Sequence, residues 1–108
     1  MELALQALAD SNRRSMLDAL TRGPATAGEL AGLLPIARPG VSRHLRVLRE
    51  AGLVEVRQEA QRRIYSLRLE PFTEIDDWLS RYRALWQQRM HALHTEVARG
   101  KRERRSTT

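Results

Sequence analysis

The sequence contains no cysteine among its 108 residues. This absence excludes a disulfide framework, a thiolate metal site and a cysteine nucleophile, and it suits a reducing compartment. The chain also has no apolar run near the roughly 18 residues that a membrane-spanning helix needs, and no signal-peptide pattern opens it. We therefore expect a soluble, cytoplasmic protein that has no membrane partner.

Signatures of catalysis are missing as well. The sequence has no Gly-rich phosphate loop and neither the HExxH nor the GxSxG motif. Its three histidines, His44, His91 and His94, do not come with a paired serine or cysteine nucleophile. The carboxylates are scattered over predicted helix surfaces. We expect neither an enzyme nor a cofactor.

Basic residues are in excess and are unevenly distributed. The formal net charge is +6 and the isoelectric point is near 11.1. Residues 35–69 carry eight basic and three acidic side chains, residues 99–108 carry five and one, and the rest of the chain is slightly acidic. Such a charge favours an anionic partner, either nucleic acid or a membrane surface. Residues 99–108 have no apolar side chain, so we expect a basic disordered tail there, after one domain at 1–98.

Local signals predict a mainly α fold with a small β-hairpin, an α+β chain. Thr26 and Glu29 have the spacing of a capping box, Pro39 fits the first turn of a helix, and Gly52 fits a helix end. Two β-branched runs separated by a polar turn predict the hairpin. The expected helices cover about residues 2–9, 11–21, 26–34, 38–51 and 71–98, and the expected strands cover about 53–58 and 62–68.

The helix expected at 38–51 separates an apolar face from a basic one. At 100° per residue, Val41, Leu45 and Leu48 share the face that packs inward. Arginine can bond guanine O6 and N7 in a major groove, and serine can bond a base or a phosphate. The helix therefore suits DNA, although a solvated basic surface is the alternative. Ser42, Arg43 and Arg46 point outward, near Pro39. Arg38 and Arg49 lie on one shoulder of the helix. His44 lies on the flank beside the buried face, where it is either a packing residue or a phosphate contact.

The order of the elements is informative. Three short helices before a basic hairpin form a winged helix-turn-helix, a DNA-binding architecture. The hairpin carries Arg62 and Arg63 at its tip and Arg57 on the partner strand. These side chains are placed to reach phosphates or a minor groove. Double-stranded DNA is therefore the predicted partner.

Three segments carry a resemblance to a known family. "ALADSNRRSMLDAL", "VSRHLRVLREAGLV" and "RRIYSL" make residues 3–95 resemble the ArsR-type bacterial transcriptional repressors. The resemblance implies a winged-helix homodimer that binds an imperfect palindrome and blocks transcription. It places DNA contacts at Arg38, Pro39, Ser42 and Arg43. The later "IDDWLSRYRALWQQRMHAL" resembles a branch with a Trp-rich last helix and no obvious metal ligands.

The chain departs from the metal-sensing members of that family. Members that sense arsenic, cadmium or lead carry a Cys-x-Cys where this chain has Ala31 and Leu33. His91 and His94 lie one helical turn apart and are weak candidates for a zinc ligand pair. The partner positions of zinc-sensing members hold a tryptophan and a serine here. We expect no metal site, and a zinc-responsive repressor that uses these histidines is the alternative.

The last predicted helix carries a broad apolar stripe. Such a stripe, with two tryptophans, would leave apolar surface exposed on a monomer, so we expect a homodimer through the first and last helices. The alternative is that Trp78, Tyr82 and Trp86 line a pocket for an aromatic or lipid-like effector, whose identity is unknown. The expected interface residues are Leu3, Phe72, Ile75, Leu79, Tyr82, Trp86 and Leu93.

A different class of function is also compatible with the charge. It is a module for protein interaction or for nucleic-acid binding without sequence specificity. RNA-binding modules usually expose aromatic side chains on a sheet. Tyr65, the only aromatic residue of the hairpin, is instead expected to face the core.

Overall fold

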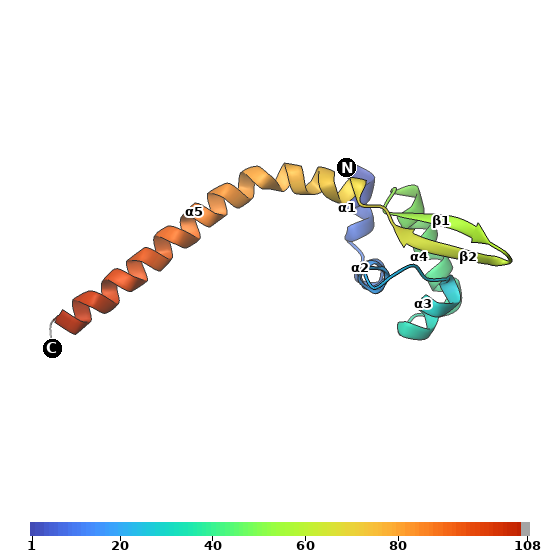
Figure 1. The fold of residues 1–108 in the computed structure, drawn as a ribbon, viewed down its shortest axis with the longest axis horizontal. Coiled ribbons are helices and arrows are strands. Elements are labelled where there is room, and N and C mark those ends of the chain that lie inside the picture. The colour runs from blue at the N-terminus through green and yellow to red at the C-terminus, as the bar shows by residue number, and fades with distance from the viewer. Residues whose placement is uncertain (107–108) are drawn as a thin grey trace. The chain divides into compact units, whose positions relative to one another are not determined.

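Residues 1–106 form five helices and one antiparallel hairpin in the order of a winged helix-turn-helix (Figure 1). The computed structural model describes residues 1–106, and the side chains of residues 1–100. Met1–Glu74 form one compact unit and the chain from Ile75 onward forms a second, and each is described by itself. The elements are α1 (Glu2–Leu8), α2 (Ser11–Leu20), α3 (Ala27–Leu33), α4 (Arg38–Glu50), β1 (Val54–Glu59), β2 (Arg62–Leu67) and α5 (Glu70–Ser106).

The predicted fold class is confirmed, and one predicted boundary is wrong. Every end lies within about one residue of its expected position except the last, because α5 runs to Ser106 rather than to residue 98. Arginine, lysine and glutamate are good helix formers, so the loss of apolar side chains does not end a helix. Residues 99–106 are therefore helical where we expected a disordered tail. The rest of that predicted tail, residues 107 and 108, lies outside the described residues.

Two arginines of the first unit have a structural role. The Nε of Arg13 donates a hydrogen bond to the carbonyl of Ala7 at 2.7 Å, and the Nη1 of Arg14 donates one to the carbonyl of Leu8 at 2.8 Å. These carbonyls are left unpaired by the end of α1, and basic side chains commonly cap them. The side chains of α2 therefore hold the end of the short α1 in place.

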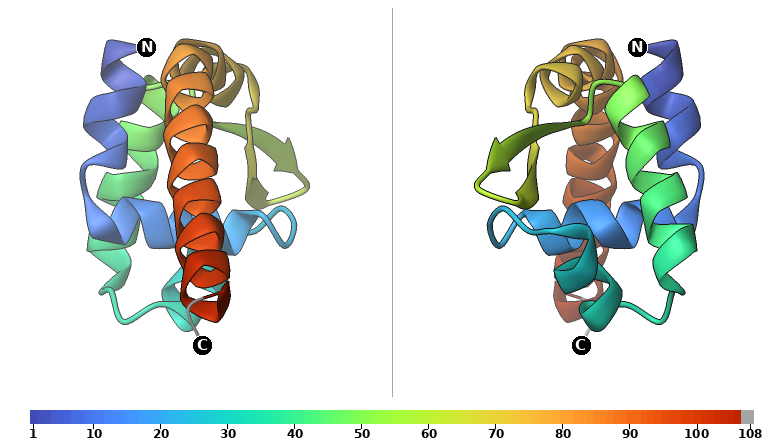
Figure 2. Two further views of the ribbon diagram at one scale, coloured as in Figure 1. Left: turned by 90° about the vertical axis from the view of Figure 1, so that its left-hand side faces the viewer. Right: turned by 90° about the vertical axis from the view of Figure 1, so that its right-hand side faces the viewer.

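The buried face of α4 is the centre of the first unit. Val41, Leu45 and Leu48 are at most 1% exposed, as the helical wheel predicted. α4 contacts α1, α2, α3 and β1, and Figure 2 shows α1 alongside α4 with α2 crossing both. The other buried residues of this core are Ala4, Ala7, Met16, Leu17, Leu20, Leu30, Leu53, Val54 and Tyr65.

The wing is tied to the helices through its second strand. β1 and β2 pair in an antiparallel register that runs from Val54 opposite Leu67 to Glu59 opposite Arg62. On the other edge of β2, the backbone N–H of Ala25 donates to the carbonyl of Tyr65 at 3.0 Å, and the N–H of Tyr65 donates back at 2.8 Å. Tyr65 is 8% exposed, so the expectation that it faces the core is confirmed.

The turn of the wing contains a residue in an unfavourable conformation. Ala60 has a φ of +56°, a region that residues other than glycine adopt at a cost of about 1–2 kcal/mol.

Glycine at position 60 would remove this strain. It would also increase the conformational entropy of the unfolded chain, which offsets part of the gain. We therefore expect Ala60→Gly to raise the free energy of unfolding by about 0.5–1 kcal/mol. Urea unfolding at one fixed protein concentration measures this. Ala60→Val, which adds branching at the same φ, should lower the midpoint, and an unchanged or lower midpoint for Ala60→Gly contradicts the strain.

Candidate nucleic-acid interface

The solvent-facing side of α4 carries two neighbouring sets of side chains. Arg38, Ser42, Arg46 and Arg49 follow one another at steps of three or four residues, so they share the flank that faces the wing. Arg43 is exposed farther round the helix, where it lines neither of the grooves between α4 and the wing. The core face fixes this division, because it determines how α4 is rotated.

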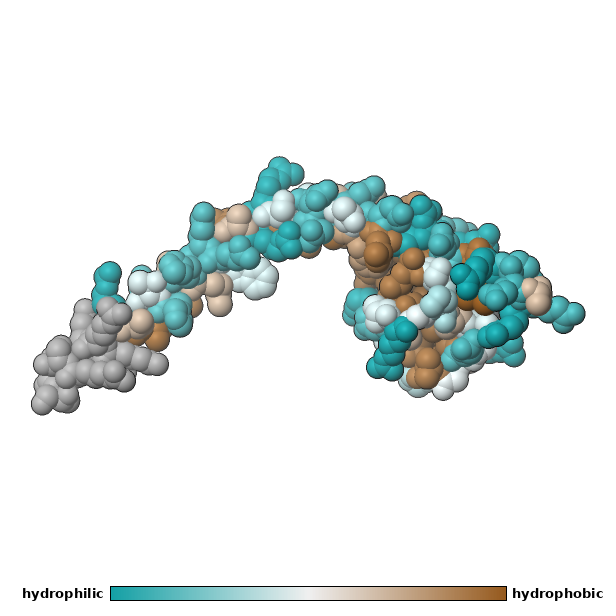
Figure 3. Space-filling view, viewed as in Figure 1, coloured by the Kyte–Doolittle hydropathy of each residue, from teal (hydrophilic) through white to brown (hydrophobic). Residues whose placement is uncertain are grey.

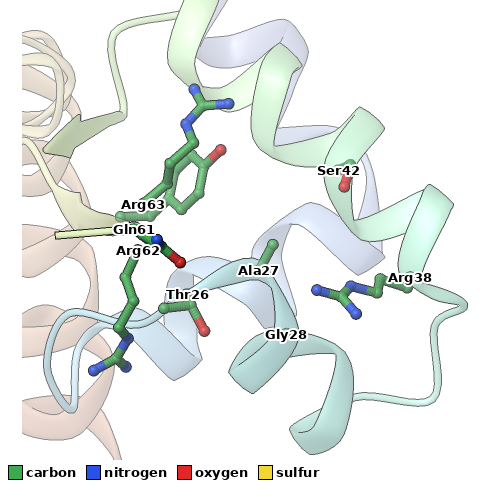
Figure 4. A pocket seen from close by; sticks show the side chains of 9 residues that line it. Thr26, Ala27, Gly28, Arg38, Ser42, Gln61, Arg62 and Arg63 are labelled. Carbon is green, nitrogen blue, oxygen red and sulfur yellow. The ribbon is translucent and has the colours of Figure 1, made fainter. Parts of the chain in front are cut away.

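Two open grooves lie between α4 and the wing. The first, about 400 Å³, is enclosed by the start of α3, the start of α4 and the tip of the wing (Figure 4). The second, about 220 Å³, lies farther along α4. Ser42, Arg63 and Tyr65 line both, so the two are continuous, and we call them the arginine groove. The first is lined by Thr26, Ala27, Gly28, Arg38, Ser42, Gln61, Arg62, Arg63 and Tyr65, and the second by Ser42, Leu45, Arg46, Arg49, Arg63 and Tyr65.

Arg63 is directed into the groove by an aromatic ring. Its guanidinium carbon lies 5.9 Å from the centroid of the Tyr65 ring, within the range of a cation–π interaction. Tyr65 is itself fixed by burial and by its backbone pair with Ala25. Figure 4 shows that Arg62 and Arg63 leave the strand in opposite directions, as alternation along a strand requires. Of the arginines at the tip of the wing, Arg63 therefore faces α4.

The other two wing arginines are engaged by carboxylates. Arg57 lies on the face of the hairpin opposite to Arg63, and its Nη2 is 3.4 Å from Oε2 of Glu59. The structure therefore does not bring Arg57 into the arginine groove. Arg62 borders the groove, but its Nη2 lies 2.9 Å from Oε1 of Glu29.

Glu29 has two functions at once. The hydroxyl oxygen of Thr26 accepts the backbone N–H of Glu29 at 3.1 Å, and Oε1 of Glu29 accepts the backbone N–H of Thr26 at 3.3 Å. The predicted capping box is therefore present. The same Oε1 accepts the guanidinium of Arg62. The backbone N–H of Thr26, then its hydroxyl, and then the charge of Arg62 lower the pKa of Glu29 below its usual value.

Arg38 and His44 lie on different sides of α4. Arg38 reaches over the start of α3, where a Cβ added at Gly28 would lie 3.7 Å from its Nη2, an ordinary van der Waals distance. His44 is half-buried on the opposite flank, near the residue that caps α2, Asp10. The backbone N–H of Arg13 is the main cause of the lowered pKa of Asp10, and His44 is a smaller one. This surrounding favours the packing role of His44 over a phosphate contact.

Sequence reasoning placed Arg49 on a shoulder of α4 without assigning it a DNA contact, and it assigned none to Thr26 or Gln61. Arg49 stands seven residues after Ser42 and three after Arg46, so the helical repeat alone places it on their flank. Thr26 and Gln61 come from other segments and had no local signal that pointed to the groove.

The second unit presents the apolar stripe that the sequence predicted. Figure 3 shows apolar side chains interrupting the polar surface of α5. Phe72 and Ile75 are half-buried, and Leu3 of α1 is 61% exposed. The exposed members on α5 are Trp78, Leu79, Tyr82, Leu85, Trp86, Met90, Leu93 and Val97, and we call them the α5 stripe.

The aromatic residues of the alternative effector pocket lie on the α5 stripe. The rings of Trp78 and Tyr82 contact each other, with centroids 5.2 Å apart. An open hollow of about 240 Å³ lies beside Trp86 and is bordered by Arg83, Gln87 and Met90. Of the three aromatic residues, Trp86 alone borders that hollow.

The described part of the chain holds neither a metal-binding cluster nor a membrane-spanning helix. His91 and His94 are exposed on α5, and residues 1–100 hold no cluster of three or more His, Asp or Glu side chains with the geometry of a metal site. No helix within residues 1–106 is both long and apolar enough to cross a membrane.

Comparison with known proteins gives concordant matches. A family model described as a helix-turn-helix domain matches residues 8–57. The chain is 52% identical over 64 residues to the HTH-type transcriptional regulator Rv2034 of Mycobacterium tuberculosis, which covers 59% of this chain and 60% of that protein. It is 32% identical over 79 residues to the transcriptional repressor SdpR of Bacillus subtilis, which covers 73% of this chain and 88% of that protein.

A solved structure extends these matches to the fold. The crystal structure of an ArsR family transcriptional regulator superposes with a TM-score of 0.69 at 36% identity, over 80% of this chain and 89% of that one. The chain spans less than two thirds of the length of the Mycobacterium tuberculosis regulator, but most of the Bacillus subtilis repressor and of the solved regulator. These matches confirm the resemblance carried by the three sequence segments: the chain belongs to the ArsR family of DNA-binding helix-turn-helix transcriptional regulators and is not an enzyme.

Proposed function

We propose that this protein is a homodimeric repressor that binds an imperfect palindrome, with α4 in the major groove and the wing on the flanking backbone. The observation that carries the proposal is the arginine groove, in which two elements distant in sequence present arginines to one open surface. The assignment as a repressor follows the Bacillus subtilis relative, which is a transcriptional repressor. Such a protein acts where its DNA is, in the cytoplasm of a bacterial cell.

Sequence is read, in this proposal, by the outermost side chains of α4. Arg43 and Ser42 are exposed beyond the buried face, with Pro39 in the first turn beside them. Arginine bonds a guanine through two atoms at once, which gives Arg43 the larger share of discrimination. Arg38, on the shoulder, lies at the groove edge.

The phosphate backbone is held by the flank of α4 and by the wing. Arg46 and Arg49 line the same groove as Arg63, so a strand that passes over it meets three guanidinium groups. Contacts of this kind orient the protein without reading sequence. They also release counterions, which makes affinity depend on salt.

Dimerisation covers the α5 stripe. Exposed apolar side chains over five helical turns, among them two tryptophans, are typical of an interface. A second copy is self-complementary to this surface, because a two-fold axis places the same residues on both sides. The dimer presents α4 twice, at half-sites about one helical turn, roughly 34 Å, apart. Leu3 of α1 and the half-buried Phe72 and Ile75 extend the interface at the start of α5.

The two kinds of DNA contact respond differently to mutation. Arg43→Ala should cost about 1–3 kcal/mol per half-site and relax the preference at one base pair, which the geometry of arginine predicts to be a guanine. Arg63→Ala should weaken binding to all duplexes alike and reduce the salt slope by about one per subunit. Selection of bound duplexes from a random pool supplies the site, and titrations at several salt concentrations measure both effects.

Arg22→Ala is the matched control for these variants. It removes an exposed arginine from the end of α2, outside the arginine groove, and should change neither preference nor slope. If Arg43→Ala binds the selected site as tightly and selectively as the wild type, Arg43 does not read sequence. If the pool yields no preferred site, the protein is a nonspecific binding module instead.

The dimer is tested on the α5 stripe. Trp86→Glu places a charge in the centre of the proposed interface and should give monomers or insoluble protein, because a buried unpaired carboxylate is costly. Gln88→Glu adds the same charge on the opposite side of α5 and should leave the dimer intact. Sedimentation at micromolar concentration distinguishes the species. A wild-type monomer that binds DNA fully would refute the dimer.

Metal should have no effect on this repressor. His91 and His94 provide two ligands of the four that a structural zinc site uses. We therefore expect micromolar zinc to leave DNA affinity unchanged in titrations with a fluorescent duplex. One tight zinc per subunit in calorimetry, lost in His91→Ala, would instead establish the zinc-responsive alternative.

A further inference from the structure

We infer that Glu29 competes with DNA for Arg62 and thereby limits the part of DNA affinity that does not depend on sequence. The inference rests on the proposed function, since it assigns a role within the arginine groove. It assigns that role to an acidic residue of α3, whose charge repels the phosphates of DNA.

The geometry of the pair is the first support. Nη2 of Arg62 lies 2.9 Å from Oε1 of Glu29, although the two residues are 33 positions apart in the sequence. Hydrogen bonds with charged groups on both sides are the stronger ones. The Arg62 side chain is 63% exposed and that of Glu29 is 53% exposed, so an anion from solvent has access to the same guanidinium.

The position of Glu29 is held independently of Arg62. Its Oε1 also accepts the backbone N–H of Thr26 at 3.3 Å and the hydroxyl of Thr26 at 3.0 Å. The capping box therefore keeps the carboxylate at the start of α3, whether or not Arg62 is bound. Arg62 therefore reaches from the wing to a carboxylate that is already fixed. When Arg62 moves to a phosphate, the carboxylate of Glu29 stays in place.

The place of the pair at the groove gives the contact its consequence. Arg62 borders the same groove as Arg38, Ser42 and Arg63, so a DNA strand over that groove passes within its reach. To bind this strand, Arg62 must leave Glu29, and the carboxylate then takes up a cation. The DNA releases one counterion when Arg62 binds a phosphate, and Glu29 takes one up. Because the net release is close to zero, Arg62 adds little to the affinity or to its salt dependence.

A charge-neutral substitution separates this role from the cap. Glu29→Gln removes the competing charge, while glutamine at this position still completes a capping box. We expect affinity for a fluorescent duplex of random sequence to increase about two- to fivefold, the range of an exposed ion pair. The salt slope should become steeper by about 0.9 per subunit, because the contact of Arg62 then releases a counterion without compensation. If Glu29→Gln impaired folding, duplex affinity would decrease, so misfolding cannot produce the expected increase.

The gain must also depend on Arg62. Arg62→Ala should change affinity by less than about twofold in the wild-type background, and should abolish the whole gain in the Glu29→Gln background. Glu55→Gln is the control, because it removes an exposed carboxylate from β1 for which the described residues show no ion pair. Any gain from Glu55→Gln should persist when Arg62 is replaced.

The outcomes distinguish a failure of the inference about Glu29 from a failure of the proposed function. If Glu29→Gln binds like the wild type, or if its gain survives Arg62→Ala, then Glu29 does not compete for Arg62 and the inference is overturned while the proposed function stands. If the wild type does not bind duplex DNA even at low salt, the proposed function and the inference both fall.

Discussion

The rotation of α4 about its own axis is the constraint on which the proposed DNA-binding surface depends. Val41, Leu45 and Leu48 are buried against four other elements, and no other rotation of this helix hides all three. The same rotation turns Arg43 to solvent and sets Arg46 on the flank beside the wing. Core packing and ligand recognition are thus opposite sides of one short amphipathic helix, so a substitution in the core changes where the arginines point.

The wing is positioned by backbone pairing as well as by its buried side chains. Two hydrogen bonds join Ala25 to Tyr65, so the segment before α3 and the strand after the turn share one edge. This edge brings Arg62 close to the capping box and lets Arg63 lie along a buried aromatic ring. Neighbouring arginines in the sequence consequently have different environments: one is engaged by a carboxylate, and the other is free to face α4.

Local sequence signals were sufficient for nearly all of the fold. Thr26 with Glu29, Pro39 and Gly52 each set a helix end through contacts within a few residues, and the helical repeat identified the core face of α4. The end of α5 was missed because helix propensity continued after the apolar repeat had stopped. The partner of Arg62 was missed for another reason: it lies in a distant segment, and only the folded wing brings the two together. Likewise, the register of the hairpin decides on which of its two faces Arg57 lies.

In the proposed dimer, the α5 stripe makes the order of the last helix depend on protein concentration. A long helix gains little stability from its backbone alone, and most of what holds it in water comes from packing of its apolar face. Here the second unit consists of that helix, and its apolar face is open within the described chain. When a second copy covers it, association and helix stability are linked by mass action, so dilution weakens both together. In the proposed dimer, a fall in protein concentration therefore reduces both the order of α5 and the pairing of the two α4 helices, so binding to a palindrome would depend on the amount of protein present.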